Sequence, residues 1–125
     1  MAAGDVTRAS TSGMLQVVAL LLAAKDGLCA VYVADSLPVA WERLKFAARQ
    51  MGIEAAFNET RKTVAIPGPI EPGIIRVLGP DDTDKLRGSE IDAAVVDRRT
   101  DAINDMIRPR LAARRGWVVY ADEAL

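Results

Sequence analysis

Apolar residues recur along the chain in short blocks separated by polar turns, and the first block is the longest. Residues 14–24 are apolar almost all round, and residues 10–12 in front of them are Ser, Thr and Ser, which are good helix caps. This pattern predicts a buried helix over about 13–25 that Gly27 ends. Residues 28–34 are rich in β-branched and aromatic side chains, which indicates a buried strand.

The next periodic segment predicts a second helix. Asp35 and Ser36 can cap its start, Pro38 suits its first turn and Gly52 suits its end. Four apolar residues fall on one face at helical spacing, and we expect that face to pack on a sheet: Ala40, Leu44, Ala47 and Met51.

Shorter blocks follow, joined by turn-forming residues. They predict strands at 53–57, 63–66, 74–78, 91–96 and 117–121, and a helix that begins at Thr100 or Asp101 and is kinked or ended by Pro109. Helices that alternate with apolar strands predict a three-layer α/β domain with a largely parallel sheet. We expect one domain over residues 1–125, with residues 1–9 flexible.

Composition excludes several kinds of chemistry. The chain has 16 Lys and Arg against 17 Asp and Glu, so its net charge predicts neither nucleic-acid nor membrane binding. It has no histidine and one cysteine, which excludes Cys/His zinc sites and histidine-based nucleophilic catalysis. Cys29 lies in an apolar run and is expected to be a small buried side chain. The apolar run 14–24 is shorter than the roughly 20 residues that span a bilayer and lacks the flanks of a signal peptide, so we expect no membrane contact.

Arginine is concentrated near the C-terminus. The simplest interpretation is a solvated helix face, and the alternative is a surface that contacts a partner protein or the phosphates of DNA. The residues concerned are Arg98, Arg99, Arg108, Arg110, Arg114 and Arg115.

Carboxylates at the ends of apolar strands are the best candidates for metal chemistry. Asp97 directly follows the apolar block 91–96, and a strand that delivers a carboxylate in this way is how P-loop ATPases hold magnesium. The block 118–121 ends in a second acidic pair, which includes Glu123 as a weaker candidate base. Asp81, Asp82 and Asp84 lack the spacing of a calcium loop and are expected to form a solvated turn.

The order of these features resembles the ATPase domain of the large terminase subunit of tailed bacteriophages, the motor that packages DNA. The similarity covers about 13–121. It is carried by residues 31–34 followed by the helix with Trp41 to Lys45, by Leu86-Arg87-Gly88 before the strand that ends in Asp97, and by Arg115-Gly116-Trp117. The resemblance implies a P-loop-NTPase-like fold, Mg-ATP as cofactor and a phage or prophage protein in the bacterial cytoplasm. It also implies terminase, portal or homo-oligomer partners, and contact with the DNA backbone.

The phosphate-binding loop of that family has no good counterpart here. It should end in glycine, lysine and Ser/Thr, whereas this chain has Gly13, Met14 and Leu15, and Arg8 stands at the loop's first glycine. The lysine that reaches the β- and γ-phosphates and the hydroxyl that holds magnesium are therefore missing. Arg8 remains a weak candidate for a phosphate contact. The strand that should lead into the loop is not visible in residues 1–7, so the first strand is expected to be missing.

The catalytic glutamate is also replaced. In the family it follows the magnesium-binding aspartate, but here Arg98 follows Asp97, and a guanidinium does not act as a base. An ion pair between the two side chains would compete with a metal, so Asp97 is expected to be vestigial.

These departures predict a truncated terminase-like protein with degenerate Walker A and Walker B motifs, a pseudo-ATPase that serves as a structural or regulatory module with no bound nucleotide. One alternative is residual ATP binding and hydrolysis, with Arg8 and backbone amides at 10–14 on the phosphates and Asp97 and Glu123 supplying metal and base. A second alternative is a protein-interaction module that reuses the fold.

Overall fold

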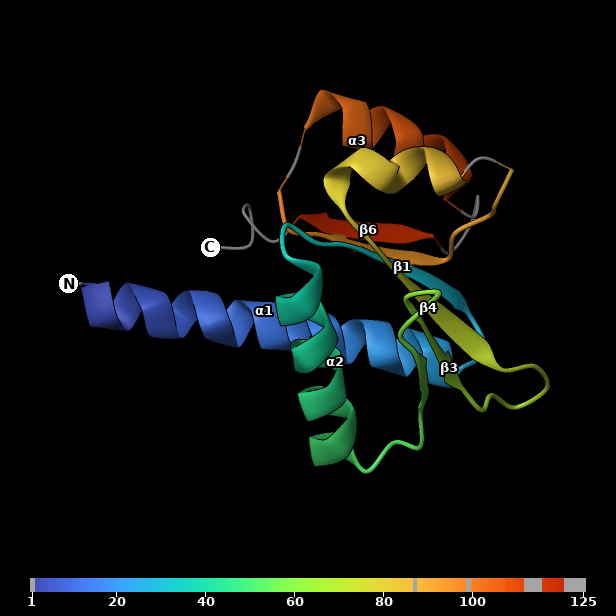
Figure 1. The fold of residues 1–125 in the computed structure, drawn as a ribbon, viewed down its shortest axis with the longest axis horizontal. Coiled ribbons are helices and arrows are strands. Elements are labelled where there is room, and N and C mark those ends of the chain that lie inside the picture. Colours follow the sequence, from blue (N-terminus) through green and yellow to red (C-terminus); the bar gives the residue numbers. More distant parts are fainter. Residues whose placement is uncertain (1, 87, 99, 112–115, 121–125) are drawn as a thin grey trace.

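The computed structural model describes residues 2–86, 88–98, 100–111 and 116–120. Eleven elements follow one another along the chain (Figure 1): α1 (Ala2–Lys25), β1 (Cys29–Val33), α2 (Leu37–Met51), β2 (Ala56–Asn58), β3 (Thr63–Ile66), β4 (Gly73–Leu78), the 3-10 helix η1 (Pro80–Leu86), β5 (Ala93–Val96), α3 (Asp101–Ile107), the 3-10 turn η2 (Arg108–Arg110) and β6 (Trp117–Tyr120). The alternation of helices and strands predicted from the apolar blocks is confirmed.

The strands form one six-stranded sheet in the order β2-β3-β4-β1-β5-β6. β1 pairs in parallel with β4 and with β5, and β5 pairs in parallel with β6. β2 and β3 form an antiparallel hairpin, which joins the rest of the sheet through the antiparallel pair β3–β4. The expected three-layer α/β fold with a mostly parallel sheet is therefore confirmed.

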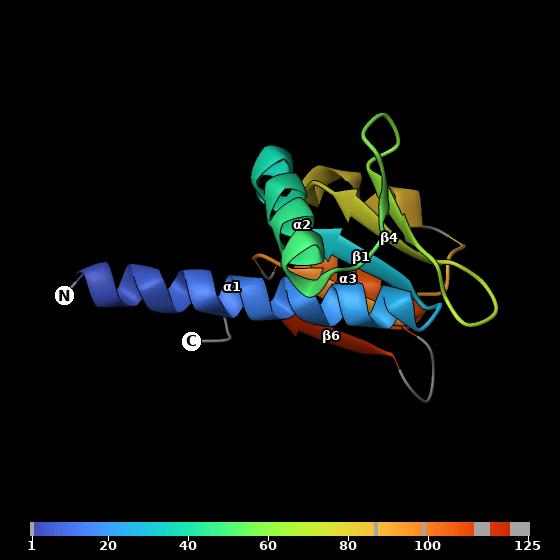
Figure 2. The same cartoon turned by 90° about the horizontal axis from the view of Figure 1, so that it is seen from below.

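The side chains of β1 alternate between two cores because successive residues of a strand point to opposite faces. Ala30 and Tyr32 belong to the larger core, which α1 and α2 cover, and Val31 and Val33 belong to the smaller core under η1 and α3. Figure 2 shows α1 and α2 on one side of the strands and α3 on the other. Trp41 lies in the larger core, 5% exposed, and meets Phe57 edge to face, as expected for a packing aromatic.

The first helix is much longer than its apolar block. α1 begins at Ala2 and runs without a break through residues 10–12, so the expected helix start at about 13 is wrong. The flexibility of residues 1–9 stays a prediction. Serine and threonine can occupy a helix interior at small cost, and the alanines near the N-terminus favour helix. No strand precedes α1 within the residues that the structure describes.

The helix boundaries elsewhere follow local signals. Ser36 caps α2, and its Oγ accepts a hydrogen bond from the Val39 backbone N–H at 3.4 Å. Gly52 ends α2 with φ +65, a conformation that glycine adopts without strain. Thr100 caps α3 in the same way as Ser36 caps α2, and α3 ends at Ile107, before Pro109.

One expected burial is wrong. Cys29 is exposed, because it is the first residue of β1 and its thiol lies at the amino end of the strand. The apolar N-terminal run is buried on one side only. Val17, Leu20 and Leu21 are fully buried, whereas Leu15 is 66% exposed and Leu22 is 48% exposed. Among the described residues, no helix is both long enough and apolar enough to span a bilayer.

Candidate functional site

The carboxyl ends of β1 and β5 form the place where this fold would bind a ligand. The two strands are neighbours in the sheet, with Val33 opposite Val96. After β1 the chain enters α2 on one face of the sheet, and after β5 it enters α3 on the other face. Ligands of open α/β sheets bind at such a switch point, in the crevice outside the strand ends. Asp35 follows β1 and Asp97 follows β5, so both residues stand at this switch point.

Both carboxylate oxygens of Asp97 are hydrogen-bonded to the protein's own β1 segment. Oδ2 accepts from the Asp35 backbone N–H at 3.0 Å, and Oδ1 accepts from the Tyr32 hydroxyl at 3.3 Å. The Asp97 backbone N–H in turn donates to the Val33 carbonyl at 2.9 Å. Asp97 thus joins the end of β5 to the end of β1 through three hydrogen bonds.

Tyr32 connects this carboxylate to α2. Its side chain is 1% exposed, and a buried phenol needs a hydrogen-bond partner at its polar tip. The hydroxyl donates to Asp97 and accepts from Arg43 Nη1 on α2 at 3.1 Å. Arg43, Tyr32 and Asp97 therefore form one chain of hydrogen bonds from helix to sheet, which we call the Asp97 network.

Burial sets the protonation behaviour of this network. Loss of solvent raises the pKa of Asp97, and the negative charge of Asp35 adds to that rise. The hydrogen bond from the Asp35 N–H and the positive charge of Arg43 oppose it. Burial, with the charge of Asp97 as a second cause, also raises the pKa of Tyr32. The tyrosine is therefore a neutral donor at ordinary pH.

Arg98 does not pair with Asp97, so that expectation is wrong. Its Nη2 lies 3.2 Å from Oδ2 of Asp35, and the two side chains are 70% and 42% exposed. Each Asp97 oxygen accepts one hydrogen bond from the protein, and the more exposed Asp35 carboxylate is the anion that Arg98 contacts. An exposed pair of this kind contributes little stability.

The residues aligned with the phosphate-binding loop lie inside a helix. Arg8, Gly13, Met14 and Leu15 are all part of α1. Within a helix each amide donates to the carbonyl four residues earlier, and only the first four amides are free. The amides at 10–14 lie well past the start at Ala2, so they are not the free amides of a helix N-terminus. The expected loop geometry is therefore wrong for this segment.

The side chains of Met14 and Leu15 have apolar surroundings or face solvent. Met14 lines an apolar hollow together with residues of α2, and the side chain of Leu15 is 66% exposed. A phosphate site requires amides and cations, which these two side chains do not supply.

The acidic side chains of the described residues do not gather into one cluster. No three His, Cys, Asp or Glu side chains within the described ranges come close enough to share a metal ion. The role of Asp97 as a single metal ligand stays a prediction. Asp82 lies 3.8 Å from Lys85 in η1, and the acidic turn 81–84 is part of that 3-10 helix. Glu123 lies outside the described residues.

The arginines near the C-terminus are spread over different local partners. Arg108 donates through Nε to Asn104 Oδ1 at 2.9 Å. Arg110 donates to two backbone carbonyls, from Nε to Leu86 at 2.8 Å and from Nη1 to Met106 at 2.8 Å. The hydrogen bond from Arg110 to Leu86 therefore connects η2 to the last residue of η1. Three of the predicted interface residues lie outside the described residues: Arg99, Arg114 and Arg115.

Two members of the Asp97 network, Tyr32 and Arg43, are not singled out as site residues by the sequence. Asp35, whose backbone N–H also meets Asp97, is expected only to cap a helix. One signal was available, since a tyrosine within an otherwise apolar buried strand requires a polar partner. The identity of that partner depends on which strands are neighbours.

Comparison with known proteins identifies the fold. No family model and no curated protein matches the sequence. The large terminase from a thermophilic bacteriophage superposes with a TM-score of 0.69 at 9% identity, over 83% of this chain and 29% of its own. The same protein in complex with ATP-γ-S gives a TM-score of 0.70 at 10% identity, over 90% of this chain and 30% of its own.

The structure of a second terminase is also similar to this chain. The large terminase ATPase domain of Thermus phage P74-26 has a TM-score of 0.62 and 18% identity, over 86% of this chain and 52% of that domain. The chain thus spans less than a third of the first terminase and about half of the second structure. This chain has the mixed α/β fold of phage large terminase ATPase domains.

Proposed function

We propose that this chain is a terminase-large-subunit-like protein whose ATPase core is catalytically degenerate, and that it acts as a structural or regulatory module of a phage DNA-packaging system. The fold supports the family. The chemistry of the site supports the loss of catalysis, because positioning and charge neutralisation of the γ-phosphate are the main sources of phosphoryl-transfer rate.

The observation that carries the proposal is the engagement of Asp97. In a P-loop ATPase this carboxylate is turned toward a hydrated magnesium ion. Here its two oxygens accept from Tyr32 and from the Asp35 backbone. A metal at Asp97 would have to compete with both donors, and the Arg98 that follows supplies no base.

The course of α1 supports the same conclusion. A phosphate-binding loop requires a turn with free amides before its helix, and the segment aligned with it is helical from Ala2 onward. With Met14 and Leu15 in place of lysine and Ser/Thr, neither a loop cation nor a magnesium hydroxyl is available at these positions.

A turnover assay tests the proposal. Purified chain with Mg-ATP, with and without double-stranded DNA, is expected to release phosphate no faster than the Asp97→Ala variant. Turnover that depends on Asp97 would contradict the proposal and favour residual ATPase activity. That alternative draws support from the solved terminases in complex with ADP and ATP-γ-S, which carry the same fold.

A module of this kind needs partners, and terminase, portal and DNA are the ones we propose. DNA is tested by titration with duplex at several salt concentrations. Affinity that falls steeply as salt rises would support contacts between arginines and phosphates. Absence of binding at low salt would restrict the module to protein partners. A phage or prophage protein of this type would act in the cytoplasm of the bacterial host.

A further inference from the structure

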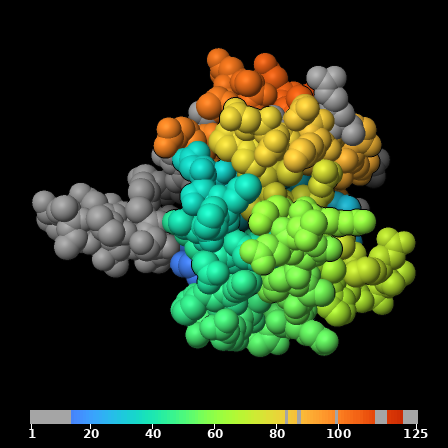
Figure 3. Space-filling model, viewed as in Figure 1, coloured from blue at the N-terminus to red at the C-terminus, as the bar shows by residue number. Residues whose placement is uncertain are grey.

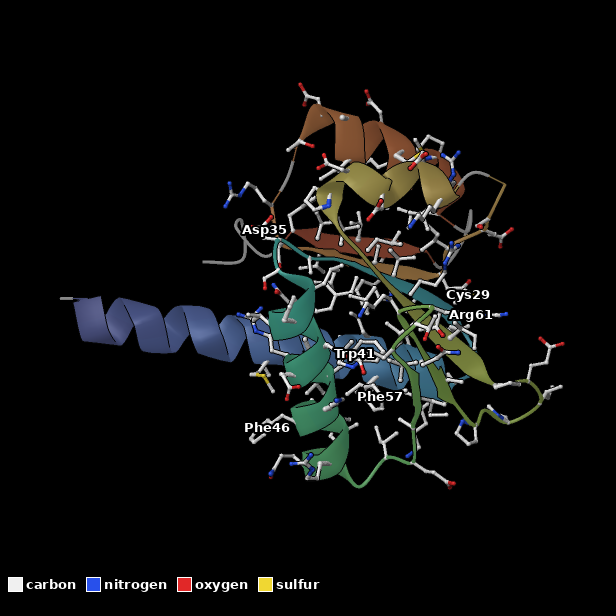
Figure 4. The ribbon with its side chains drawn as sticks, viewed as in Figure 1. Cys29, Asp35, Trp41, Phe46, Phe57 and Arg61 are labelled. Atoms are coloured by element: carbon white, nitrogen blue, oxygen red, sulfur yellow. The ribbon has the colours of Figure 1, made fainter. Side chains whose placement is uncertain are left out.

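The two edges of the sheet differ in how they are protected. The β2 strand at one edge is three residues long and ends in Asn58. α2 packs beside it, and Figure 3 shows α2 lying against the β2–β3 hairpin. Trp41 of α2 and Phe57 of β2 meet with ring centroids 5.2 Å apart, and Figure 4 shows both side chains between the helix and the hairpin. A short edge strand beside a helix is a poor template for pairing with another chain.

The β6 strand at the other edge has no such protection within the described part of the chain. Its residues, Trp117–Tyr120, are all aromatic or β-branched, with no charge, no proline and no break in the register with β5. The side chains of Trp117, Val118 and Val119 are only partly buried. α1 packs on β1, β4 and β5, and Figure 2 shows β6 at the border of the sheet. An apolar edge strand of this kind favours pairing with a further strand.

The backbone of β6 has hydrogen-bonding groups on its outer side. The Trp117 N–H donates to the carbonyl of Asp92, which precedes β5, at 3.0 Å. Neighbouring residues of a strand direct their N–H and C=O groups to opposite sides, so those of Val118 point away from β5. None of the strands that the structure describes lies on that side of β6. Val118 is therefore placed to pair with a strand from outside.

The sequence around β6 carries opposite charges on its two sides. Arg114 and Arg115 precede the strand, and Asp122 and Glu123 follow it. No other residue of the segment 112–125 is charged. These four residues lie outside the described ones, so the pattern is a property of the sequence. An antiparallel second copy brings the basic pair of one chain beside the acidic pair of the other, whereas a parallel copy brings like charges together.

The charged residues described next to β6 face away from its outer edge. Asp92 and Asp97 lie at the two ends of β5, and their carboxylates accept from backbone N–H groups at the two ends of the β1 segment. Arg108 in η2 donates to Asn104 of α3, which also accepts from the Tyr120 hydroxyl. Arg108 therefore belongs to the α3 side of the sheet. The charge pattern along the outer edge is thus set by the residues that flank β6.

We propose that β6 pairs antiparallel with β6 of a second copy of this chain, across a two-fold axis at Val118, so that the two sheets become one. An axis of this kind places one residue opposite its own copy, and the two Val118 residues then exchange both N–H···O bonds. Trp117 of one copy lies opposite Val119 of the other, and an aromatic residue opposite a β-branched one stabilises a sheet.

The same register matches the flanking charges. Arg114 of one copy falls opposite Asp122 of the other, and Arg115 falls diagonal to Glu123, within reach of its long side chain. Each pair occurs twice because of the two-fold axis.

This self-complementarity is what favours a second copy as the partner. A strand of another protein would satisfy the backbone of β6, but it would need its own matching acidic and basic pairs. A surface for DNA would be uniformly basic, whereas this edge carries both signs. The proposal does not depend on the loss of ATPase activity, so the two fail or succeed separately.

The oligomeric state of the full chain tests the pairing of the strands. Sedimentation equilibrium is expected to show a monomer–dimer equilibrium with a dissociation constant on the order of 10–100 μM, because the interface is small. Val118→Pro removes the outward N–H and keeps those that face β5, and it is expected to raise this constant at least about tenfold. The matched control is Val118→Ala, which keeps the N–H and is expected to change the constant less than about threefold. Thermal unfolding of each variant confirms that it is folded.

Charge reversal tests the antiparallel arrangement. Arg114→Asp with Arg115→Glu gives an edge with acidic residues on both sides, and Asp122→Lys with Glu123→Lys gives one with basic residues on both sides. Each variant alone is expected to raise the dissociation constant about tenfold or more, because like charges then face each other. An equimolar mixture of the two is expected to associate about as tightly as wild type, because each then meets its complement.

A control variant separates this effect from overall charge. Glu54→Lys with Glu59→Lys adds the same positive charge at exposed residues on either side of β2. This variant is expected to dimerise as wild type does and to show no preference for the acidic variant.

Three results would overturn the proposal. A monomer throughout the concentration range would leave β6 for a strand of a different protein. An assembly that Val118→Pro leaves intact would place the interface elsewhere. A mixture of the two charge variants that does not associate would exclude the antiparallel register.

Discussion

The hydroxyl of Tyr32 lies 3.3 Å from Oδ1 of Asp97, although 65 residues separate the two along the chain. This contact joins the middle strand of the sheet to the strand that carries the candidate metal ligand. A metal ion at Asp97 would have to compete with this contact, because the carboxylate already accepts hydrogen bonds from Tyr32 and from the Asp35 backbone.

Replacing Tyr32 by Phe is expected to destabilise the fold by about 1–3 kcal/mol, because Arg43 and Asp97 each lose a partner within a partly buried network. Urea unfolding monitored by circular dichroism measures the change. Val39→Ala, at an exposed position on α2, serves as a control and is expected to change stability by less than about 1 kcal/mol. An unchanged midpoint for Tyr32→Phe would show that the network contributes nothing.

The raised pKa of Asp97 predicts a pH dependence of stability. When the folded pKa of an acid lies above its unfolded value, the folded state binds the proton more tightly. The resulting contribution to stability is full below the unfolded pKa and is lost as pH rises through the folded pKa. Wild type should therefore lose stability relative to Asp97→Asn as the pH is raised through this window. Free energies of unfolding of both proteins at a series of pH values check this prediction. A stability difference that grows in favour of wild type as the pH rises would contradict it.

Arg110 is expected to be a structural residue. It donates to the carbonyls of Leu86 and Met106, so Arg110→Ala leaves two carbonyls without that donor and should cost about 1–3 kcal/mol. Arg108→Ala is the matched control, since the Arg108 side chain donates to the Asn104 side chain and lies exposed, and its removal should cost much less. Equal effects of the two substitutions on the denaturation midpoint would argue against a structural role for Arg110.

Gly73 in β4 lies directly against the backbone of α1. A Cβ on this residue would lie 1.8 Å from the carbonyl oxygen of Ala24, a distance that only a backbone shift could relieve. Gly73→Ala is therefore expected to destabilise the protein by about 3 kcal/mol or more, as overpacking does when the neighbour is rigid. The control is Gly79→Ala, where the nearest atom would be a side-chain oxygen at 3.6 Å. Thermal unfolding distinguishes them, and similar midpoints would mean that α1 does not pack this tightly.

Local sequence signals predicted those parts of the structure that depend on neighbours along the chain. Ser36 and Thr100 cap their helices as expected, and Asp97 follows its buried strand. The partners of these residues were not predictable, because the contact between Tyr32 and Asp97 exists only when β1 and β5 are adjacent in the sheet. That adjacency results from the whole order of strand crossovers.

The wrong helix start also depends on the surrounding chain. Residues 10–12 are typical helix caps, but the helix formers before them extend α1 to Ala2. Arg110 shows a partner that its residue type does not reveal, because its side chain donates to backbone carbonyls of its own chain. Its contact with DNA or with a partner protein stays a prediction.

Isothermal titration of the purified chain with Mg-ATP and with a non-hydrolysable analogue tests whether this terminase-like fold has lost its nucleotide site. We predict no heat of binding up to millimolar nucleotide, since the aligned loop is helical and Asp97 is engaged by Tyr32 and the Asp35 backbone. Micromolar nucleotide binding that Asp97→Ala weakens would contradict the loss of the nucleotide site and would favour residual ATPase activity.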